Sequence, residues 1–513
     1  MGDPITDPLQ DAPPKALTDK VAFAQSTGPS TFRFPGDRHR SEASRWFASG
    51  AGTHPVRDGN EVMYLVDGPQ TFAEMARVMG TATDSSKHFI YILGWSLFLD
   101  FPFDASGATA ATVLSQADSR GIQIRALSWG GFLGVVTDAV KAVATINGFK
   151  NGKAFKDDRT LFAGAHHQKV VVINGTEGLT AFLGGIDIDP NRAFPMGVNG
   201  SNFAGAPFHD VHCRIRGAAA WDVLNTFVER WSDFVRAGGV APDAPVAGGP
   251  LLGASVTVGS QPTPGRLHVQ IGRTYPNSTS HNIIGPPNGP SSQLSPYSFA
   301  PTGETSLAAM FFQAIGAAKQ FIYIEDQYLV HTEASDALVK ALSTIAHLTV
   351  VFPHSDLTDM PHVWEHRKKF IDPLRAAGGK KVRIFVRSPF GAQVAHSYVH
   401  AKTWIFDDQY AIIGTANVNR RSWTHDSEIV AGIYDESTDD HASYTFAHRL
   451  RIRLWAEHLN MNDPAGHAAL ADGVASAVHW TFPGTGVVPY DENEKTDAGS
   501  VASWDTNVDP DGR

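Results

Sequence analysis

Four short segments decide how this chain is built: KHFIYI at residues 87–92, HQKVVV at 167–172, KQFIYI at 319–324 and HAKTWI at 400–405. The first and third begin 232 residues apart, and the second and fourth begin 233 residues apart. Two unrelated similarities would rarely share nearly the same offset. The chain is therefore a tandem duplication whose halves have diverged.

Both halves show the same order of expected elements. A helix leads into an apolar strand, and a second helix and strand follow. Then come the His-x-Lys strand, a partner strand with small residues, and a long closing helix. The first half places them at 71–79, 89–93, 111–117, 122–127, 167–172, 181–186 and 218–236, and the second at 306–317, 321–324, 334–343, 348–352, 400–405, 411–416 and 444–458.

Apolar strands that alternate with helices indicate mixed sheets covered on both faces. The expected fold is α/β, with two tandem α/β/α sandwich repeats related by a pseudo-two-fold axis and a shared site at their interface. Five parts are expected along the chain: an N-terminal extension at 1–60, a first repeat at 61–237, a Gly/Pro/Ser-rich connecting loop at 238–301, a second repeat at 302–482 and an acidic tail at 483–513. The tail either lies over the surface or is disordered.

Composition sets limits on function. The 513 residues are 42% hydrophobic, which is enough for large buried cores. The net charge of -10 weighs against a nucleic-acid partner and against a polybasic membrane anchor. A single cysteine, Cys213, excludes an intrachain disulfide, and we expect it to be a buried core thiol.

The first twenty residues are polar and Pro-rich and do not resemble a signal peptide. No apolar run approaches the roughly 18–20 residues that span a bilayer. We therefore expect a monomer that is cytoplasmic, or secreted without a recognisable signal, and that meets any lipid from the aqueous side.

The two His-x-Lys segments carry the candidate chemistry. Alternate residues of a strand share a face, so His167 and Lys169 point the same way, as do His400 and Lys402. One such pair alone is more often an ordinary surface feature, but two at matching places of a duplication would converge about the pseudo-two-fold axis.

Two histidines and two lysines suit the cleavage of a phosphodiester. The lysines stabilise negative charge on the non-bridging oxygens, so this chemistry requires no metal. One histidine attacks phosphorus, while the other protonates the leaving alcohol and then deprotonates the incoming water or alcohol. Both histidines have the same neighbours, so the residues alone do not assign the two roles.

Residues further along each half would complete this site. Each imidazole needs an acidic partner, and the candidates are Asp210 and Glu428 on downstream strands. Small residues in the pairs at 184–185 and 414–415 would let a phosphate approach the backbone. Asn417 is a plausible amide donor to it, and Asp187 holds the equivalent place in the first half.

These motifs resemble a known family. The segment from Tyr398 to Asn417 matches the His-x-Lys-x4-Asp signature of the phospholipase D superfamily, complete to Asp407. The first copy, with GGID at 184–187 and FHDVH at 208–212, is similar to the first repeat of plant-type phospholipase D. IEDQY at 324–328 and LWAEHL at 454–459 are similar to the plant enzymes as well, so the resemblance covers roughly residues 60–460.

The sequence also departs from that family. Asn174 stands where the first motif carries Asp. In the family that Asp supports the motif without performing the chemistry, so we expect activity to survive with altered local packing. The plant C2 domain and the animal PX and PH domains are absent from the sequence. Recruitment by calcium or phosphoinositides is therefore in doubt, and a calcium requirement stays open.

The resemblance implies a phospholipase D that converts phosphatidylcholine or phosphatidylethanolamine to phosphatidic acid and free headgroup. It implies a phosphohistidine on His167, with His400 as acid and base, and exchange of the headgroup with alcohols. No cofactor is expected for the chemistry, and the expected partner is phospholipid at a membrane surface, without nucleic acid. The expected catalytic residues are His167, Lys169, His400, Lys402, Asp210 and Glu428, and the expected substrate contacts are Asn417, Asp187, Gly185, Thr415, Asn174 and Asp407.

Three other functions stay open: a nuclease or other phosphodiesterase, a cardiolipin-synthase-like transferase, and an inactive lipid-binding protein. Two apolar segments, at 94–103 and 129–136, either contact acyl chains or belong to the core. His354, His362 and His366 match no strong metal-ligand spacing and are expected to be solvated. The basic run at 367–369 is expected to be a solvated face.

Overall fold

The computed structural model of the chain describes residues 43–50, 52–131, 138–157, 159–160, 164–202, 206–236, 250–276, 297–354, 363–387, 397–435, 444–481 and 486–490. The N-terminal segment 1–42, most of the apolar segment 129–136, His362, the Pro-rich stretch 277–296 and the tail after residue 490 lie outside the described residues. None of the described helices combines the length and the apolar character that a membrane span requires.

The first half is built from seven strands and four α-helices among the described residues. The strands are β1 (Arg57–Val66), β2 (Phe89–Gly94), β3 (Gln123–Ser128), β4 (Gly152–Lys156), β5 (Val170–Gly175), β6 (Gly178–Gly184) and β8 (Val211–Arg216). The helices are α4 (Asp67–Gly80), α5 (Ala110–Ser119), α6 (Ala139–Asn147) and α7 (Ala218–Arg236). A short strand, β7 (Ala206–His209), stands apart from this sheet.

The second half repeats this inventory. Its strands are β9 (Leu267–Tyr275), β11 (Phe321–Glu325), β12 (His347–Phe352), β13 (Val382–Arg387), β15 (Thr403–Phe406), β16 (Tyr410–Gly414) and β17 (Glu428–Tyr434), with β10 (Glu304–Thr305), β14 (Ser397–Val399) and β18 (Val487–Pro489) in addition. Its helices are α8 (Ser306–Ala317), α9 (Thr332–Ala341), α10 (Val363–Gly378), α11 (Arg420–Thr424), α12 (Phe446–Leu459) and α13 (Pro464–Ala469).

The strands form one mixed sheet whose order is a palindrome about β1 and β9. Outward from β1 the order is β8, β6, β5, β2, β3, β4, and outward from β9 it is β17, β16, β15, β11, β12, β13. Each step is antiparallel in both halves until the last two, which are parallel in both. This order is what a pseudo-two-fold axis between β1 and β9 produces. The predicted fold class is confirmed.

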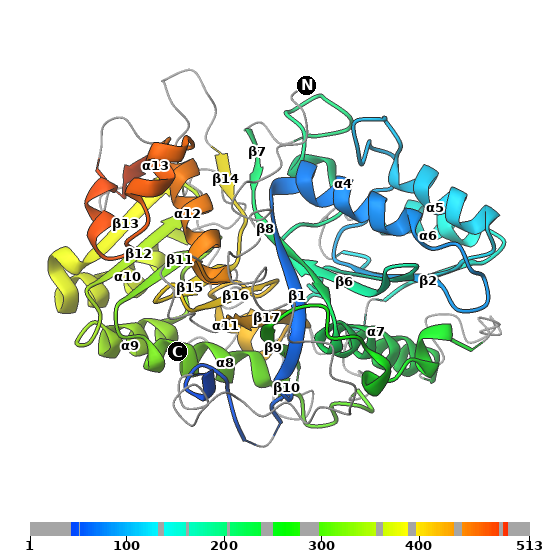
Figure 1. Cartoon of the computed structure of the whole chain (residues 1–513), viewed down its shortest axis with the longest axis horizontal. Helices are drawn as coiled ribbons and strands as arrows, with labels where there is room; N and C mark the ends of the chain where they lie inside the picture. The colour runs from blue at the N-terminus through cyan, green and yellow to red at the C-terminus, as the bar shows by residue number, and fades with distance from the viewer. Residues whose placement is uncertain are drawn as a thin grey trace, which may run out of the picture.

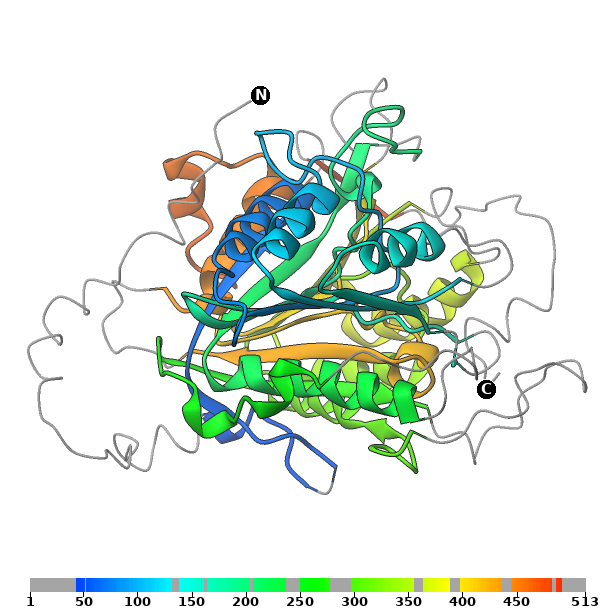
Figure 2. The same cartoon turned by 90° about the vertical axis from the view of Figure 1, so that its right-hand side faces the viewer.

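Helices cover both faces of this sheet. In Figure 1, α4, α5 and α6 lie above the strands of the first half, and α7 lies below them. Figure 2 shows the strands nearly edge-on between the helix layers. One buried apolar cluster joins α4, α5 and α6 to the first half, and a second joins α8, α9 and α10 to the other half. A third contains α7 and α12 with strands of both halves, so the two repeats share a core.

The connecting segment corrects one expectation. Residues 238–301 are expected to be a loop, but Leu267–Tyr275 within them form the fully buried strand β9. Gly, Pro and Ser dominate the composition around it and conceal a nine-residue strand, of which residues 268–274 pair with β17. The segment is therefore both a connection and the source of the strand through which the second half of the sheet meets β1.

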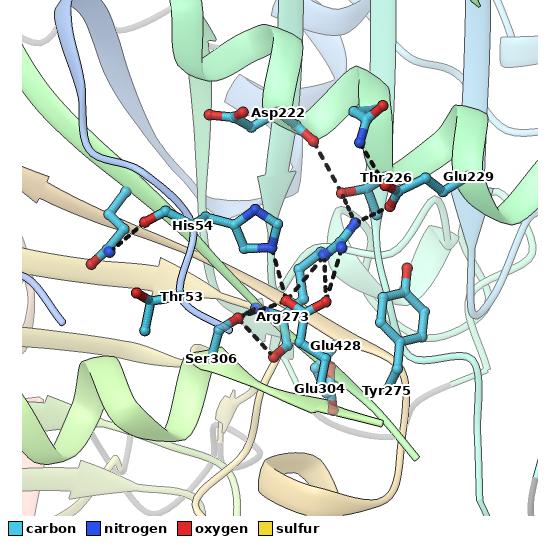
Figure 3. A network of polar contacts seen from close by, with 12 residues as sticks. Thr53, His54, Asp222, Thr226, Glu229, Arg273, Tyr275, Glu304, Ser306 and Glu428 are labelled. Carbon is cyan, nitrogen blue, oxygen red and sulfur yellow. Dashed lines mark hydrogen bonds and ion pairs between the residues drawn. The ribbon is translucent and has the colours of Figure 1, made fainter. Parts of the chain in front are cut away.

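Arg273 on β9 binds this strand to both halves (Figure 3). Its Nη1 donates to Glu229 of α7 at 2.6 Å, and its Nη2 donates to Glu304 of β10 at 2.8 Å. Glu304 also contacts His54 Nε2 at 2.8 Å. Because Arg273 is buried, these charge-assisted contacts are shielded from solvent and hold the halves in register.

Three smaller expectations have clear outcomes. Cys213 is a buried core thiol on β8, as predicted. The apolar side chains at 97, 99, 101 and 103 are buried in the core around α4, whereas Trp95 and Phe98 are half-buried, and acyl contact at these two stays a prediction. The expectation that Arg367 is solvated is wrong. This side chain is fully buried and donates to the backbone oxygens of Gln327, Tyr328 and Pro353.

The two residues that end the His-x-Lys motifs provide a test of stability. Asp407 accepts hydrogen bonds from three consecutive backbone N–H groups, those of residues 319–321, at 2.7–2.9 Å. Its counterpart Asn174 donates Nδ2 to Lys87 O at 3.0 Å. We predict that Asp407→Ala lowers the free energy of unfolding by about 2–4 kcal/mol and that Asn174→Ala lowers it by less than about 1 kcal/mol. Urea unfolding of both variants measures the difference, and equal losses would contradict it.

Candidate active site

The two His-x-Lys segments converge at the junction of the halves. The backbone N–H of His167 donates to Ser427 O at 2.9 Å, and that of His400 donates to His209 O at 2.8 Å. Each motif is therefore held by a backbone hydrogen bond to the opposite half. Figure 1 shows β7 and β14, which lead into the second of these contacts, side by side.

Each histidine also takes its carboxylate from the other half. His167 Nδ1 lies 2.9 and 3.0 Å from the two oxygens of Glu428, and His400 Nδ1 lies 2.6 Å from Asp210 Oδ2. A carboxylate on Nδ1 fixes the proton there and leaves the Nε2 lone pair for chemistry. The two pairs are equivalent under the pseudo-two-fold axis, and neither half could form its pair alone.

The lysines occupy equivalent positions with different neighbours. Lys169 Nζ donates to His167 O at 3.1 Å, lies 3.3 Å from Asp187 Oδ1 and lies 5.4 Å from the ring centre of Trp95. Lys402 Nζ donates to His400 O, and to Gln327 Oε1 at 3.0 Å. The two cations are thus fixed beside the two histidines.

Burial determines the charge states in this site. Burial, with Lys169 and Lys402, lowers the pKa of His167 well below its usual value, and burial with Lys402 and Arg192 does the same for His400. Burial raises the pKa of Asp210 and of Glu428 to about 7. Both imidazoles are therefore neutral near pH 7, as a nucleophile at Nε2 requires.

Family models and relatives identify the superfamily to which the chain belongs. A model described as phospholipase D matches residues 190–348, and one described as cardiolipin synthase, PLD-like domain, matches residues 311–450. Phospholipase D alpha 1 of Carica papaya is 25% identical over 535 residues, and phospholipase D alpha 2 of Arabidopsis thaliana is 26% identical over 527 residues. The chain belongs to the phospholipase D superfamily.

Each of these plant alignments covers 74% of this chain and 63% of the relative, so the chain spans less than two thirds of their length. Among solved structures, phosphatidylserine synthase of Haemophilus influenzae is 12% identical with a TM-score of 0.46, covering 86% of this chain and 98% of that one. A polyphosphate kinase of Porphyromonas gingivalis is 10% identical with a TM-score of 0.41, covering 82% of this chain and 56% of that one.

Two of the predicted substrate contacts, Thr415 and Gly185, support the carboxylates of the site. Thr415 Oγ1 donates to Glu428 Oε2. A Cβ at Gly185 would lie 2.0 Å from Asp210 Oδ1, so only glycine leaves Asp210 its place against His400. Gly185 and Thr415 thus shape the two histidine–carboxylate pairs, and their contact with phosphate stays a prediction.

Asn174 and Asp407 are wrong as substrate contacts. Their hydrogen bonds go to the starts of β2 and β11, at the ends of these strands that face away from the histidines. The strand direction explains this, because each of them is five positions beyond the motif lysine along an extended strand. Their side chains bond to the backbone at the starts of the neighbouring strands and so support the scaffold of the site.

Asp187 and Asn417 occupy equivalent places but differ in role. Asp187 accepts from Arg192 Nη2 at 2.6 Å and pairs with Lys169, so it anchors two cations and cannot donate to phosphate. Asn417 is buried, and among the described residues its side-chain oxygen has no hydrogen-bond partner. It stays a predicted amide donor to substrate.

Arg192 is the main residue that the sequence did not reveal. It is buried, lies 4.3 Å from the ring centre of Phe208, and contributes to the lowered pKa of His400. Phe208 in turn lies 5.7 Å from the ring of His400. The duplication gave no signal for this arginine, because Ser422 stands at the same distance from Asn417 as Arg192 does from Asp187.

A buried cluster behind the site consists of His209, Glu325 and His458. His209 Nε2 and His458 Nε2 lie 3.1 and 2.8 Å from the oxygens of Glu325, and Tyr323 donates to the same carboxylate at 2.6 Å. These spacings suit hydrogen bonds between the groups. The expectation that the chemistry needs no metal stays a prediction, as does the open calcium requirement.

The crossed pairs generate a direct prediction. Glu428→Gln and Asp210→Asn should each lower the turnover of bis(p-nitrophenyl) phosphate by roughly 10²–10⁴-fold, because an amide no longer fixes the proton on Nδ1. Circular dichroism and urea unfolding should show a folded protein in both cases. Thr415→Val, which keeps the carboxylate and removes one donor to it, should lose roughly tenfold. Wild-type turnover in either amide variant would contradict the assigned roles.

Proposed function

We propose that the protein is a phospholipase D that hydrolyses the distal phosphodiester of phosphatidylcholine or phosphatidylethanolamine. The products are phosphatidic acid and the free headgroup alcohol. The observation that supports this most directly is the pair of crossed histidine–carboxylate contacts with a lysine beside each histidine. Such a site offers a nucleophile, an acid and two cations at one phosphorus.

In the first step, the Nε2 lone pair of His167 attacks phosphorus. The bond from phosphorus to the headgroup oxygen breaks, and His400 gives the Nε2 proton to that oxygen. The result is a phosphatidyl group bonded to His167, with the headgroup released as an alcohol. Glu428 accepts the Nδ1–H of His167 and stabilises the positive charge that develops on this ring.

In the second step, a water molecule attacks phosphorus while neutral His400 takes its proton. The phosphorus–nitrogen bond breaks, phosphatidic acid leaves and both histidines return to their starting states. A primary alcohol in place of water gives a new phosphatidyl ester, so headgroup exchange accompanies hydrolysis. The two steps balance without an oxidant, a reductant or a metal ion.

His400 needs a proton before it can serve as the acid. The pKa of His400 is low in the free site because the group is buried beside cations, Lys402 and Arg192 foremost. A bound phosphodiester brings a negative charge to these cations, which favours the imidazolium form. Asp210 Oδ2 lies 2.6 Å from the other ring nitrogen, Nδ1, and accepts its proton, which also favours the imidazolium form.

A lipid is favoured over a nucleic acid as the source of the phosphodiester. The net charge of -10 weighs against the basic surface with which nucleic-acid enzymes hold the phosphate backbone of their substrate. The plant relatives carry the name phospholipase D. Contact with the membrane would be peripheral.

Product analysis over a substrate panel tests this function. We expect headgroup release from phosphatidylcholine or phosphatidylethanolamine vesicles, and phosphatidylethanol when ethanol is added. The result should be the same with and without a chelator. A preference for single-stranded DNA would overturn the proposal in favour of a nuclease, and joining of two phosphatidylglycerol molecules would favour a cardiolipin-synthase-like transferase.

The covalent step has its own test. After rapid acid quench of turnover, mass spectrometry of His167→Ala should show no phosphatidyl adduct, and wild type should carry the adduct on the peptide that contains His167. His400→Ala should accumulate that adduct with activated substrates, because its second step lacks a base. Turnover of His167→Ala equal to that of the wild type would rule out this mechanism. No turnover by the wild type itself would instead favour an inactive lipid-binding protein.

Arg192→Gln tests the electrostatic argument. Its removal should lower turnover by roughly 10²-fold. It should also raise the pKa of His400, since a neighbouring cation is lost. The alkaline limb of kcat/KM, where protonated His400 disappears, should therefore move to higher pH.

A matched control uses Arg421, a half-buried arginine, which donates to Asp426 at 2.8 Å. Arg421→Gln should leave the alkaline limb where it is in wild type, whatever happens to the rate. A limb that stays in place or moves down in Arg192→Gln would rule out the electrostatic role.

A further inference from the structure

The segment from Pro190 to Ser201 forms a loop with an unusual surface. Met196 is 60% exposed and Val198 is 44% exposed, two residues apart at its tip. These two belong to a short set of large apolar side chains that are this open in the described chain: Val140, Met196, Val198, Phe312, Val474 and Val478. Residues 193–208 also contain no Asp, Glu, Lys or Arg, although 18% of the whole chain is charged.

The tip is held rigidly by its own backbone. The N–H of Gly197 donates to Ser201 O at 2.8 Å, and that of Val198 donates to Pro195 O at 3.1 Å. Ser201 Oγ and the N–H of Asn202 both bond to Asn191 Oδ1, at 3.0 and 2.9 Å. The apolar side chains are therefore presented to solvent by a defined turn, at a cost in hydration that a purely structural loop has no reason to carry.

The base of the same loop reaches the active site. Arg192 binds Asp187, the partner of Lys169, and Phe194 packs on the core residue Phe101 with ring centres 6.0 Å apart. Met196 is four positions after Arg192, so their Cα atoms lie within about 14 Å of each other. The tip therefore lies within about 14 Å of a residue of the site.

We propose that Met196 and Val198 insert into the lipid surface and seat the active site on it, an inference that rests on the proposed lipid substrate. A membrane fits this tip better than a protein would, because the tip offers apolar area with no charge to pair. Insertion removes the two side chains from water while the polar base of the loop stays at headgroup level. The loop then links membrane contact to Arg192 and so to the cations of the site.

Two matched double variants test the proposal. Met196→Asp with Val198→Asp removes the apolar tip. Val474→Asp with Val478→Asp is the control, since these residues are 37% and 64% exposed. The control pair lies near the amino ends of β12 and β13, away from the site: Gly473 O contacts His347 Nε2, and Ala477 O accepts from Arg383. Co-sedimentation with phosphatidylcholine vesicles measures binding, and bis(p-nitrophenyl) phosphate measures the chemistry.

We expect the Met196/Val198 variant to lose roughly tenfold or more in vesicle binding and in release of choline from vesicles. Its turnover of the soluble diester should stay within about twofold of wild type, and the control variant should match wild type in every assay. Vesicle binding of the Met196/Val198 variant equal to that of wild type would overturn the proposal. If wild type releases no choline, the proposed function fails, and the binding assay still decides the role of the loop.

A labelling experiment gives an independent answer. The chain has one cysteine, Cys213, and it is buried, so a new surface thiol can be labelled selectively. An environment-sensitive dye on Val198→Cys should shift to the blue and gain intensity with phosphatidylcholine vesicles, whereas the dye on Val474→Cys should not. Equal responses at the two positions would contradict insertion of this loop.

Discussion

The exchange of acidic partners between the halves is the contact on which the rest of the structure depends. His167 of the first half bonds to Glu428 of the second, and His400 of the second bonds to Asp210 of the first. A single half would bury a histidine without its acceptor and a carboxylate without its donor, each of which is costly. The site therefore exists only when the halves are docked, and the long mixed sheet and the shared core serve to dock them.

The strand β9 shows how the docking is achieved. It pairs with β17, which begins at Glu428, and its Tyr275 hydroxyl accepts a hydrogen bond from Gln168 Nε2 at 3.0 Å. Gln168 stands between His167 and Lys169, and its side-chain oxygen accepts from Arg230 at 3.0 Å. The segment that joins the repeats in sequence thus also supports the first motif in space, and Arg273 on the same strand ties it to α7 and β10.

The duplication made most of the fold and the centre of the site predictable. The offsets of the repeated segments gave the strand pattern of both halves, and a pseudo-two-fold axis then brought two histidines and two lysines together. What could not be predicted lies where the halves differ or where composition misleads. Arg192 could not be found from the duplication, because Ser422 stands in its equivalent place. The strand β9 lies inside a Gly/Pro/Ser-rich segment, whose composition predicts a loop. Arg367 belongs to a run of three cations that predicts a solvated face, but its N–H groups donate to buried carbonyl oxygens. The sequence predicts Asp210 and Glu428 as the acidic partners of the two histidines. That each histidine bonds to the carboxylate of the opposite half follows only from the packing of the halves.

The shifted pKa values of the site share one cause and have a joint consequence. Burial lowers the pKa of both histidines and of Lys169, lowers that of Lys402 to about 7, and raises those of Asp210 and Glu428 to about 7. Each group is thereby pushed toward its neutral form, since a buried site tolerates few unpaired charges. The proposed phosphodiester substrate would bring a negative charge to this site. Its arrival favours the charged lysine and the imidazolium at the same time, so binding the substrate also loads the proton that the leaving group requires.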